Sequence, residues 1–598
     1  MLRTHTCGEL TKEDVGKQIT LAGWVHARRD HGGVIFIDLR DRYGLTQIVA
    51  NPEINKQSAE ALDKVRSEFV IQIEGEVIAR PHEMVNKKLV TGEIEVRVNK
   101  AIVLSESQTP PFEIDEREKV KPVNEDTRLE YRYLDLRREQ KKGNIVMRHL
   151  FIKALRDFLH EKHFIEIETP ILTKSTPEGA RDYIVPSRLH PGKFYALPQS
   201  PQQYKQLLMV AGIDRYFQIA RCFRDEDQRG DRQPEFTQLD MEMSFVERDD
   251  VLTLAEELFI AVIKKLYPHK KFLSEPWPRI PYEEVMLQYG VDKPDLRFRD
   301  VMVIQDISDM VKDCGFEVFT KAVSNGDVVR AIKVENTNGV SALSRGQIDE
   351  LTEIAKKEGA KGLAYIVVEQ DGLKSAITKF IGDELAREIV ATMFAKAGDI
   401  LFFVADTRYI AQNSMGAVRN ALLKRLGFVE NADPDMLAFA YIIDFPLFEE
   451  IKNDAGFYAP SHHMFTRPRP EDEYLLTSDP FKVKSWQYDM ICNGYEVGGG
   501  SIRIHQQELQ KKIFELIGFT HKQVEYFSHM LTAFSYGVPP HGGIAPGIDR
   551  LMMLLQNEPN IREVMAFPKN QQAEDPMMHA PSEVDAKQLK DAYIDIAV

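Results

Sequence analysis

The chain has 598 residues, of which 43% are hydrophobic and 28% charged, and its formal net charge is −15 at pH 7. This length predicts about four domains rather than one core, no stretch approaches the roughly 20 apolar residues of a membrane span, and residues 1–10 lack a signal-peptide apolar region. The cysteines, Cys7, Cys222, Cys314 and Cys492, are too widely spaced for a zinc ribbon or a disulfide framework. We therefore expect a cytoplasmic protein with no membrane partner.

Residues 1–108 are predicted to form a small β-barrel of the OB type, with one helical segment at 58–66. Turn glycines separate the five expected strands, at 18–27, 34–40, 45–50, 69–78 and 94–103. Such barrels bind single-stranded nucleic acid across the sheet, although an all-β barrel without this function has the same pattern. Residues 1–105 contain 15 basic and 15 acidic residues, so the acidic excess lies elsewhere and does not exclude a nucleic-acid partner here.

A proline-rich, charged segment follows and predicts a linker over residues 109–139. Beyond it, helical patterns alternate with strands such as 193–197 and 215–222, and similar material returns near the C-terminus. We therefore expect residues 140–292 and 436–565 to share one kind of structure. Residues 293–435 between them form a different α+β segment, and residues 566–598 form a C-terminal extension.

Two segments have residues suited to a nucleotide. Residues 223–240 begin with Phe-Arg-Asp-Glu-Asp, in which Arg224 can bind phosphate oxygens, and continue to Phe236, which offers a flat face to a purine. Residues 542–550, Gly-Gly-Ile-Ala-Pro-Gly-Ile-Asp-Arg, place Arg550 at the start of an apolar helix expected over 551–555. An isolated arginine is more often part of a surface ion pair, but the two segments together indicate a phosphate-binding site.

These segments resemble motifs 2 and 3 of the class II aminoacyl-tRNA synthetases, and residues 164–170, Phe-Ile-Glu-Ile-Glu-Thr-Pro, resemble motif 1. The likeness to the bacterial-type aspartyl-tRNA synthetases is close. It also covers residues 132–137, 175–182, 199–202, 205 and 493–501. The class I signatures are not found in the sequence.

The resemblance implies that Arg224 contacts the α-phosphate and Arg550 the γ-phosphate of ATP. The implied ATP-binding set is Arg224, Asp225, Glu226, Gln233, Phe236, Glu496, Gly547, Ile548, Asp549 and Arg550. Asp489 and Glu496 match acids associated with Mg²⁺, a hard cation that prefers oxygen ligands, although ordinary exposed acids are the alternative.

For the amino acid, the resemblance assigns the side-chain carboxylate of aspartate to Lys205 and Arg503. It places Asp240 and Gln202 at the α-amino group and Glu178 on a loop that closes over substrate. An asparagine amide would leave both cations unpaired, which predicts strong discrimination. His462 matches a substrate-contacting position, and a histidine of the pocket wall with no charge role is the alternative.

In the barrel, Phe36 and Gln47 match residues that stack on and hydrogen-bond to anticodon bases, and Arg29 is expected to hold RNA. Buried packing is the alternative for Phe36, and solvated charge for Arg29. His31 and Glu83 stand where tRNA(Asp)-restricted bacterial enzymes commonly have leucine and lysine. Both departures favour an enzyme that also charges tRNA(Asn).

The sequence therefore predicts an α+β multidomain protein with an N-terminal OB barrel and a class II antiparallel-sheet catalytic domain. The implied reaction joins L-aspartate, activated with ATP and Mg²⁺, to tRNA(Asp) and also tRNA(Asn), and motif 1 implies a homodimer. The alternatives are a tRNA(Asp)-restricted enzyme, a lysyl- or asparaginyl-type synthetase and a non-catalytic tRNA-binding relative.

Overall fold

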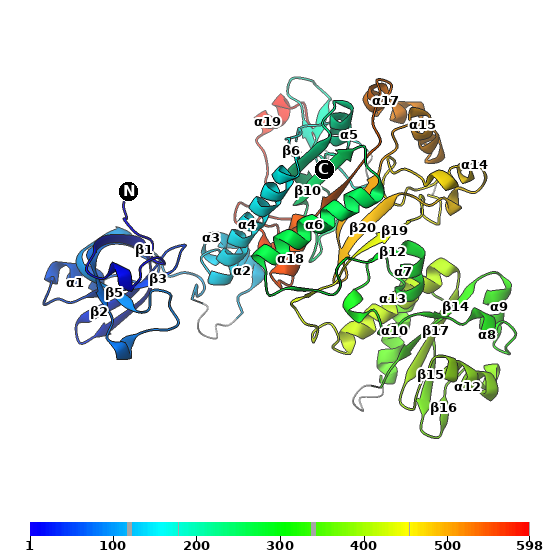
Figure 1. Cartoon of the computed structure of the whole chain (residues 1–598), viewed down its shortest axis with the longest axis horizontal. Helices are drawn as coiled ribbons and strands as arrows, with labels where there is room; N and C mark the ends of the chain where they lie inside the picture. The colour runs from blue at the N-terminus through cyan, green and yellow to red at the C-terminus, as the bar shows by residue number, and fades with distance from the viewer. Residues whose placement is uncertain (116–121, 177–178, 337–342, 454, 597–598) are drawn as a thin grey trace. The chain divides into compact units, whose positions relative to one another are not determined.

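The computed structural model describes residues 1–115, 122–176, 179–336, 343–453 and 455–596 (Figure 1). Its internal contacts divide the chain into two compact units. The first comprises residues 1–146, 566–570 and 574–581, and the second comprises residues 147–565, 571–573 and 582–598. No helix among the described residues has the length and apolar character to cross a membrane. The finer boundaries at residues 108, 139, 292, 435 and 565 are our proposal.

The first unit contains a closed five-stranded barrel in which the strands follow the order β1-β2-β3-β5-β4. Its strands and single helix are β1 (Gln18–His31), β2 (Val34–Arg40), β3 (Leu45–Ala50), α1 (Lys56–Asp63), β4 (Val70–Ala79) and β5 (Ile94–Ser105). Alternate apolar side chains point inward along each strand, so that Ile37, Ile48 and Ile73 are fully buried. The predicted barrel and its helix are confirmed, and β1 continues four residues beyond the expected end at residue 27.

Residues 125–135 of the predicted linker are helical and packed. They form α2 (Glu125–Glu130) and α3 (Arg132–Asp135). Arg132 and Asp135 are almost fully buried and lie 2.5 Å apart, and Arg132 Nε also donates to the carbonyl of Ala566 at 3.0 Å. Such pairs hold a short helix against its neighbours because each buried charge needs its partner.

The second unit is built on an eight-stranded sheet in the order β12-β19-β20-β21-β22-β10-β9-β6. In that order the strands are Arg279–Pro281, Phe439–Ile443, Gln487–Cys492, Tyr495–Ile502, His541–Pro546, Glu235–Ser244, Arg215–Phe223 and Ile165–Glu166. The sheet is antiparallel except at its two edges, where β12 and β6 run parallel to their neighbours. α4 (Glu139–Glu161), α6 (Arg248–Leu266) and α18 (Ile548–Leu555) supply side chains to its main apolar core.

A separate five-stranded sheet lies within residues 305–406, in the order β13-β14-β17-β15-β16. Its strands are Gln305–Asp306, Val328–Val334, Ile400–Asp406, Ala364–Glu369 and Gly372–Lys374. The helices of this region are α8 (Ser308–Val311), α9 (Glu317–Ser324), α10 (Arg345–Lys357), α11 (Thr378–Ile381), α12 (Asp383–Thr392) and α13 (Arg408–Arg425). Neighbouring strand residues such as Ile332 and Ala331 belong to different apolar clusters, so both faces of the sheet are covered.

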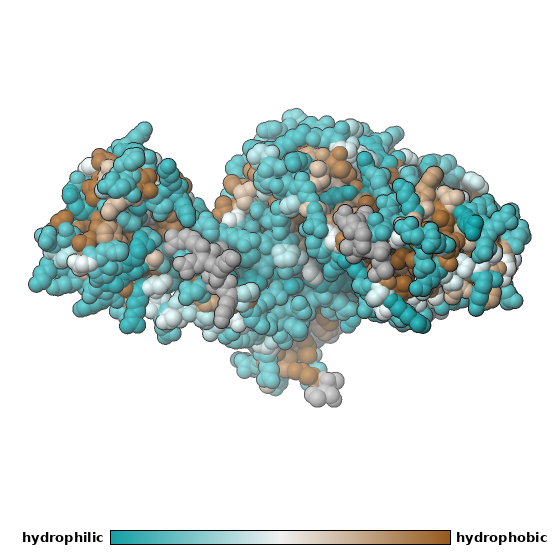
Figure 2. Space-filling view, turned by 90° about the horizontal axis from the view of Figure 1, so that it is seen from below, coloured by the Kyte–Doolittle hydropathy of each residue, from teal (hydrophilic) through white to brown (hydrophobic). Residues whose placement is uncertain are grey.

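The remaining elements are short. They are β7 (Ile184–Pro186), β8 (Phe194–Ala196), α5 (Gln202–Val210), β11 (Lys271–Phe272), α7 (Tyr282–Tyr289), β18 (Met436–Leu437), α14 (Leu475–Ser478), α15 (Gln507–Leu516), α16 (His521–Glu525), α17 (Ser528–Phe534) and α19 (Ala586–Asp591). The surface seen in Figure 2 is mainly hydrophilic, with small separate apolar areas.

Candidate active site

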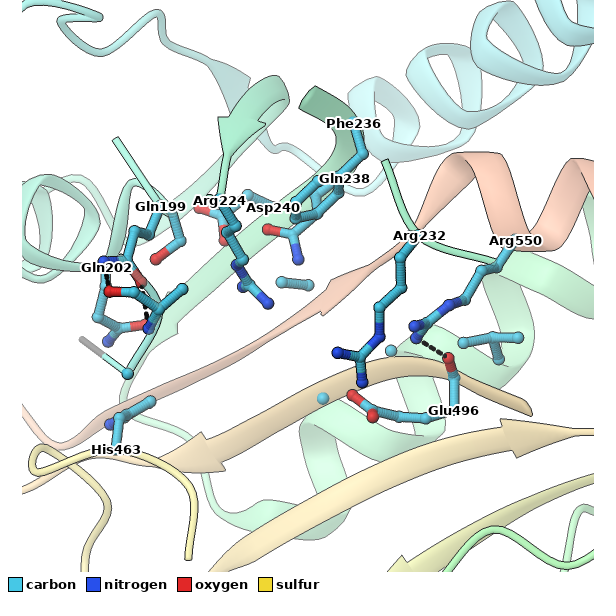
Figure 3. Close-up of a pocket in the computed structure, with 18 of the residues that line it drawn as sticks. Gln199, Gln202, Arg224, Arg232, Phe236, Gln238, Asp240, His463, Glu496 and Arg550 are labelled. Atoms are coloured by element: carbon cyan, nitrogen blue, oxygen red, sulfur yellow. Dashed lines mark hydrogen bonds between the residues drawn. The ribbon is translucent and has the colours of Figure 1, made fainter. Parts of the chain in front are cut away.

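A cavity of about 350 Å³ lies on the eight-stranded sheet. The predicted site residues that line it are Gln202, Lys205, Arg224, Glu226, Gln233, Phe236, Asp240, His462, Glu496, Arg503, Gly547, Asp549 and Arg550. In Figure 3, Gln199, Gln202 and His463 lie at one side of the pocket, and Arg232, Glu496 and Arg550 lie at the other. The structure therefore brings together residues from segments more than 300 positions apart in the chain.

Arg224 and Phe236 form one wall of the cavity. Arg224 follows β9, Phe236 lies in the paired strand β10, and the guanidinium carbon lies 5.1 Å from the ring centroid of Phe236. The Arg224 Nε is buried and has no hydrogen-bond partner among the described residues. An unsatisfied buried donor of this kind favours an incoming anion.

Arg550 is held at the other side by oxygen atoms of its neighbours. Its Nη1 donates to the carbonyl of Glu496 at 2.7 Å, and its Nη2 lies 3.0 Å from Asp231 Oδ2. Nearby, Arg232 and Glu226 lie 3.4 Å apart at the rim. Two arginines from different strands and helices thus flank one cavity, as a polyphosphate requires.

Three residues of the predicted ATP-binding set have side chains that are buried in the core or already paired with other residues of the protein. Ile548 is fully buried in the apolar core and does not line the cavity. Asp225 faces Arg181 at 3.5 Å, also outside the cavity lining. Asp549 reaches the cavity wall, but its two carboxylate oxygens already have partners, Arg148 at 2.5 Å and the Thr237 N–H at 2.7 Å. Glu178 lies outside the described residues.

Two buried cations and two buried acids meet at the base of the cavity. Lys205 Nζ lies 2.6 Å from Asp240 Oδ1 and 3.4 Å from Glu242 Oε2. Arg503 donates to both oxygens of Glu242, at 2.9 and 3.1 Å. With all four groups ionised the charges sum to zero. The expectation that asparagine would leave the cations unpaired is therefore wrong, because Asp240 and Glu242 already pair them.

The acids of this quartet, which comprises Lys205, Arg503, Asp240 and Glu242, have different environments. Burial raises the pKa of Asp240 despite the nearby Lys205. Burial also acts to raise the pKa of Glu242, but Arg503 and Lys205 outweigh it and hold that pKa below its usual range. Asp240 Oδ2 is buried and has no hydrogen-bond partner among the described residues. It is therefore suited to accept from an ammonium group.

Glu242 fits only because a glycine lies beside it. A Cβ on Gly543 of the neighbouring strand would lie 2.2 Å from Glu242 Oε2 and 2.0 Å from the Met241 carbonyl. Any side chain there would displace the carboxylate that binds Arg503. Gly543 thus makes room for the quartet.

Two adjacent histidines line the cavity, and the second, His463, was not among the predicted residues. Burial, together with Arg503 and Lys205, lowers the pKa of His462 to about 3, so its ring is uncharged at neutral pH. The Phe465 N–H donates to His463 Nδ1 at 3.1 Å, while Arg503 Nη1 lies 2.8 Å from its Nε2. A neutral imidazole has one acceptor nitrogen, so these two donors compete for it.

His541, behind the quartet, gives a prediction for acid stability. It is fully buried, and burial lowers its pKa to about 4 from the ordinary 6.5. The unfolded chain therefore binds the proton more readily between these values, so stability falls as the pH falls. The free energy of unfolding, measured with urea, is therefore expected to fall by up to about 2 kcal/mol between pH 6.5 and pH 5 because of this residue. The variant H541Q should not show this part of the fall. If the free energy of unfolding depended equally on pH in both proteins, the prediction would be contradicted.

The predicted magnesium-associated acids lie on neighbouring strands. A Cβ on Gly499 would lie 3.2 Å from Asp489 Oδ1 and 3.5 Å from Glu496 Oε1, so the two carboxylates flank one small space. Burial, then Glu496, raises the pKa of Asp489. Two converging acids fit a divalent cation that takes its remaining oxygens from substrate or water. The described residues contain no group of three or more histidine, cysteine or acidic side chains suited to a metal.

The predicted anticodon residues mostly gather on one part of the barrel. Arg29 is opposite Phe36, and His31 contacts the Phe36 ring edge-on with centroids 5.7 Å apart. Arg29 is bound by Asp38 at 2.9 and 3.0 Å, and Gln47 donates to Glu95 at 2.8 Å. Glu83 is exposed in the short 3-10 helix His82–Met84, between β4 and β5 in the chain.

Comparisons with known proteins match nearly the whole chain. The family model for class II tRNA synthetases (D, K and N) matches residues 124–571, and that for the OB-fold nucleic acid binding domain matches residues 19–104. The aspartate–tRNA(Asp/Asn) ligase of Rubrobacter xylanophilus is 52% identical over 100% of this chain and 97% of that protein. The aspartate–tRNA ligase of Bacillus licheniformis is 49% identical over 99% and 98%.

Solved structures agree in fold. The asparaginyl-tRNA synthetase of Pyrococcus horikoshii, complexed with asparaginyl-adenylate, has a TM-score of 0.58 at 20% identity and covers 95% of this chain and 98% of its own. The aspartyl tRNA synthetase of Entamoeba histolytica has a TM-score of 0.55 at 20% identity over 94% and 90%. The predicted OB barrel, class II fold and family resemblance are confirmed. The chain belongs to the class II tRNA synthetases of the D, K and N group and, within it, to the aspartate–tRNA ligase family.

Proposed function

We propose that this protein activates L-aspartate with ATP and transfers it to the 3′ end of tRNA(Asp) and of tRNA(Asn). The observation that carries the proposal is the cavity that Arg224 and Arg550 flank from two sides and that has the quartet at its base. Such a cavity can hold a polyphosphate beside a small zwitterion. Relatives named as ligases for both tRNAs support the wider tRNA range.

In the first step a carboxylate oxygen of aspartate attacks the α-phosphorus of ATP, and pyrophosphate leaves with the electrons of the broken P–O bond. Holding two anions together is the main task, since the transition state gathers charge on phosphate oxygens. Arg224 lies on the wall that would hold the α-phosphate, and Arg550 would meet the γ-phosphate. Phe236 would stack on the adenine.

Aspartate itself fits the quartet by charge. Its ammonium would donate to Asp240 Oδ2, the acceptor without a partner, and its side-chain carboxylate would lie against Lys205 and Arg503. That carboxylate would also relieve the competition of two donors for His463. An asparagine side chain offers one neutral oxygen and an unwanted donor among these cations, which disfavours it.

A magnesium ion would be held by Asp489 and Glu496 and would neutralise phosphate charge when bound. In the second step the terminal ribose hydroxyl of tRNA attacks the carbonyl of the adenylate and AMP leaves. The very low pKa of His462 makes it a poor general base. We therefore assign catalysis mainly to electrostatic stabilisation by the two arginines.

The range of tRNA substrates is tested by charging with labelled aspartate. Purified protein, ATP and Mg²⁺ are combined with equal concentrations of tRNA(Asp) or tRNA(Asn) transcripts. Comparable charging of both is expected, because exposed His31 and Glu83 replace the residues common in restricted enzymes. Charging of tRNA(Asp) alone would leave the ligase assignment intact and reject the wider range.

We also propose a cytoplasmic homodimer. Leu150 in α4 and Ile165 in β6 are exposed apolar residues in the motif 1 region, with 37% and 53% of their surfaces accessible. Sedimentation should give twice the chain mass.

A lysyl- or asparaginyl-type enzyme, or a non-catalytic tRNA-binding relative, is disfavoured by the quartet and by the retention of both arginines. Pyrophosphate exchange that depends on lysine or asparagine would reveal the first, and tRNA binding without any exchange would reveal the second.

A further inference from the structure

We propose that Arg148, outside the cavity, is a positioning residue for the ATP site and acts through Asp549. This inference rests on the proposed function, because it assigns ATP to the side of the cavity lined by Arg550 and Phe236. Arg148 belongs to the long helix α4, whereas Asp549 begins the helix α18. No motif in the sequence connects these two positions, which are 401 residues apart.

The contact is close and sheltered. Arg148 Nη1 lies 2.5 Å from Asp549 Oδ1, and the side chains are 15% and 4% exposed. The second oxygen, Oδ2, accepts the backbone N–H of Thr237 at 2.7 Å. A charge-assisted pair in this environment is little screened by water or salt. Asp549 is therefore fixed from two directions.

The residues next to Asp549 and Thr237 in the sequence connect this contact to the ATP site. Asp549 is followed directly by Arg550, and Thr237 is preceded directly by Phe236. One carboxylate thus links three segments, namely α4, the strand that carries Phe236 and the helix turn that carries Arg550. Both of those side chains line the cavity, whereas Arg148 does not. Arg148 also donates to the Val564 carbonyl, but at the longer distance of 3.5 Å, so its main route to ATP is the geometry of Asp549 and the residues that Asp549 holds.

Loss of Arg148 would leave a nearly buried carboxylate with only its bond to Thr237. The start of α18 would then shift to expose or re-pair Asp549, and Arg550 would shift with it. The Lys205 and Arg503 end of the cavity rests on separate contacts with Asp240 and Glu242. The expected defect is therefore selective for ATP over aspartate.

The test is aspartate-dependent pyrophosphate exchange, with KM measured for each substrate. R148M is expected to raise the KM for ATP at least about tenfold, since small displacements of positioned groups have large effects, while the KM for aspartate stays within about twofold. R148K should recover part of the lost ATP affinity, because lysine restores the positive charge but not the planar guanidinium group that can donate two parallel hydrogen bonds. The control K153M, on the same helix, removes an exposed pair with Asp157 and should match wild type.

D549N provides a second route if R148M does not fold, since it keeps the shape of the side chain and removes its charge. It should show the same ATP-selective rise. Equal changes in both KM values, or a fall in melting temperature with both unchanged, would make Arg148 purely structural and overturn the inference. Absence of aspartate-dependent exchange in the wild type would instead reject the proposed function.

Discussion

The substitution R503M is expected to abolish aspartate activation and to lower the free energy of unfolding by about 3–5 kcal/mol. Arg503 is 1% exposed and binds both oxygens of Glu242, so among the described residues its removal leaves that acid with Lys205, at 3.4 Å, as its one cationic partner. The remaining quartet would have a net negative charge, which also repels the aspartate carboxylate. Urea unfolding and pyrophosphate exchange measure the two effects separately.

A double variant distinguishes stability from substrate binding. R503M/E242Q removes a cation and an anion together, so most of the lost stability should return while activity stays absent. A double variant as unstable as R503M would show that the ion pair is not the source of the loss. Normal aspartate KM in R503M would show that Arg503 does not bind the substrate.

R224A is expected to reduce the rate of aspartate-dependent pyrophosphate exchange by on the order of 10³-fold, the loss typical of removing one transition-state donor. Its stability should change little. The Arg224 Nε has no hydrogen-bond partner to lose, and its contact with Phe236 is a partly exposed cation–π pair. The variant should therefore melt close to the wild-type temperature and still bind aspartate.

Arg221 provides the matched control. It lies three residues earlier on β9, is 41% exposed, pairs with Glu235 and does not line the cavity. Exposed pairs contribute little, so R221A should exchange pyrophosphate at nearly the wild-type rate. Equal losses in R221A and R224A would place the defect in the strand rather than in phosphate binding.

Local patterns predicted the barrel well because its strands alternate apolar and polar residues between glycine turns. Val34–Arg40 and Leu45–Ala50 have the bounds expected from sequence. β1 was predicted too short because its last residues, Arg28 to His31, are all polar and have no apolar alternation. The end of β1 is held instead by its pairing with β2. The sequence of β1 alone does not indicate this contact.

The site residues were predicted from the family resemblance, and some that the resemblance did not supply were missed. Glu242 is the clearest case. Leu239, Met241 and Met243 alternate with Asp240 and Glu242 along β10, a period-2 pattern that places both acids on one face. This pattern was available in the sequence. The role of Asp549 was not, because its partner Arg148 is 401 residues away in the chain and is brought to it only by the tertiary fold.

The glycine beside Glu242 and the pairing within the quartet together restrict how this pocket can evolve. A replacement that removes one charge of the quartet leaves an odd charge in the interior, and a side chain at position 543 would collide with Glu242, so such intermediate sequences are expected to be unstable as well as inactive. Acceptance of a different amino acid would require at least two coordinated replacements. Gradual drift of substrate choice is thereby hindered.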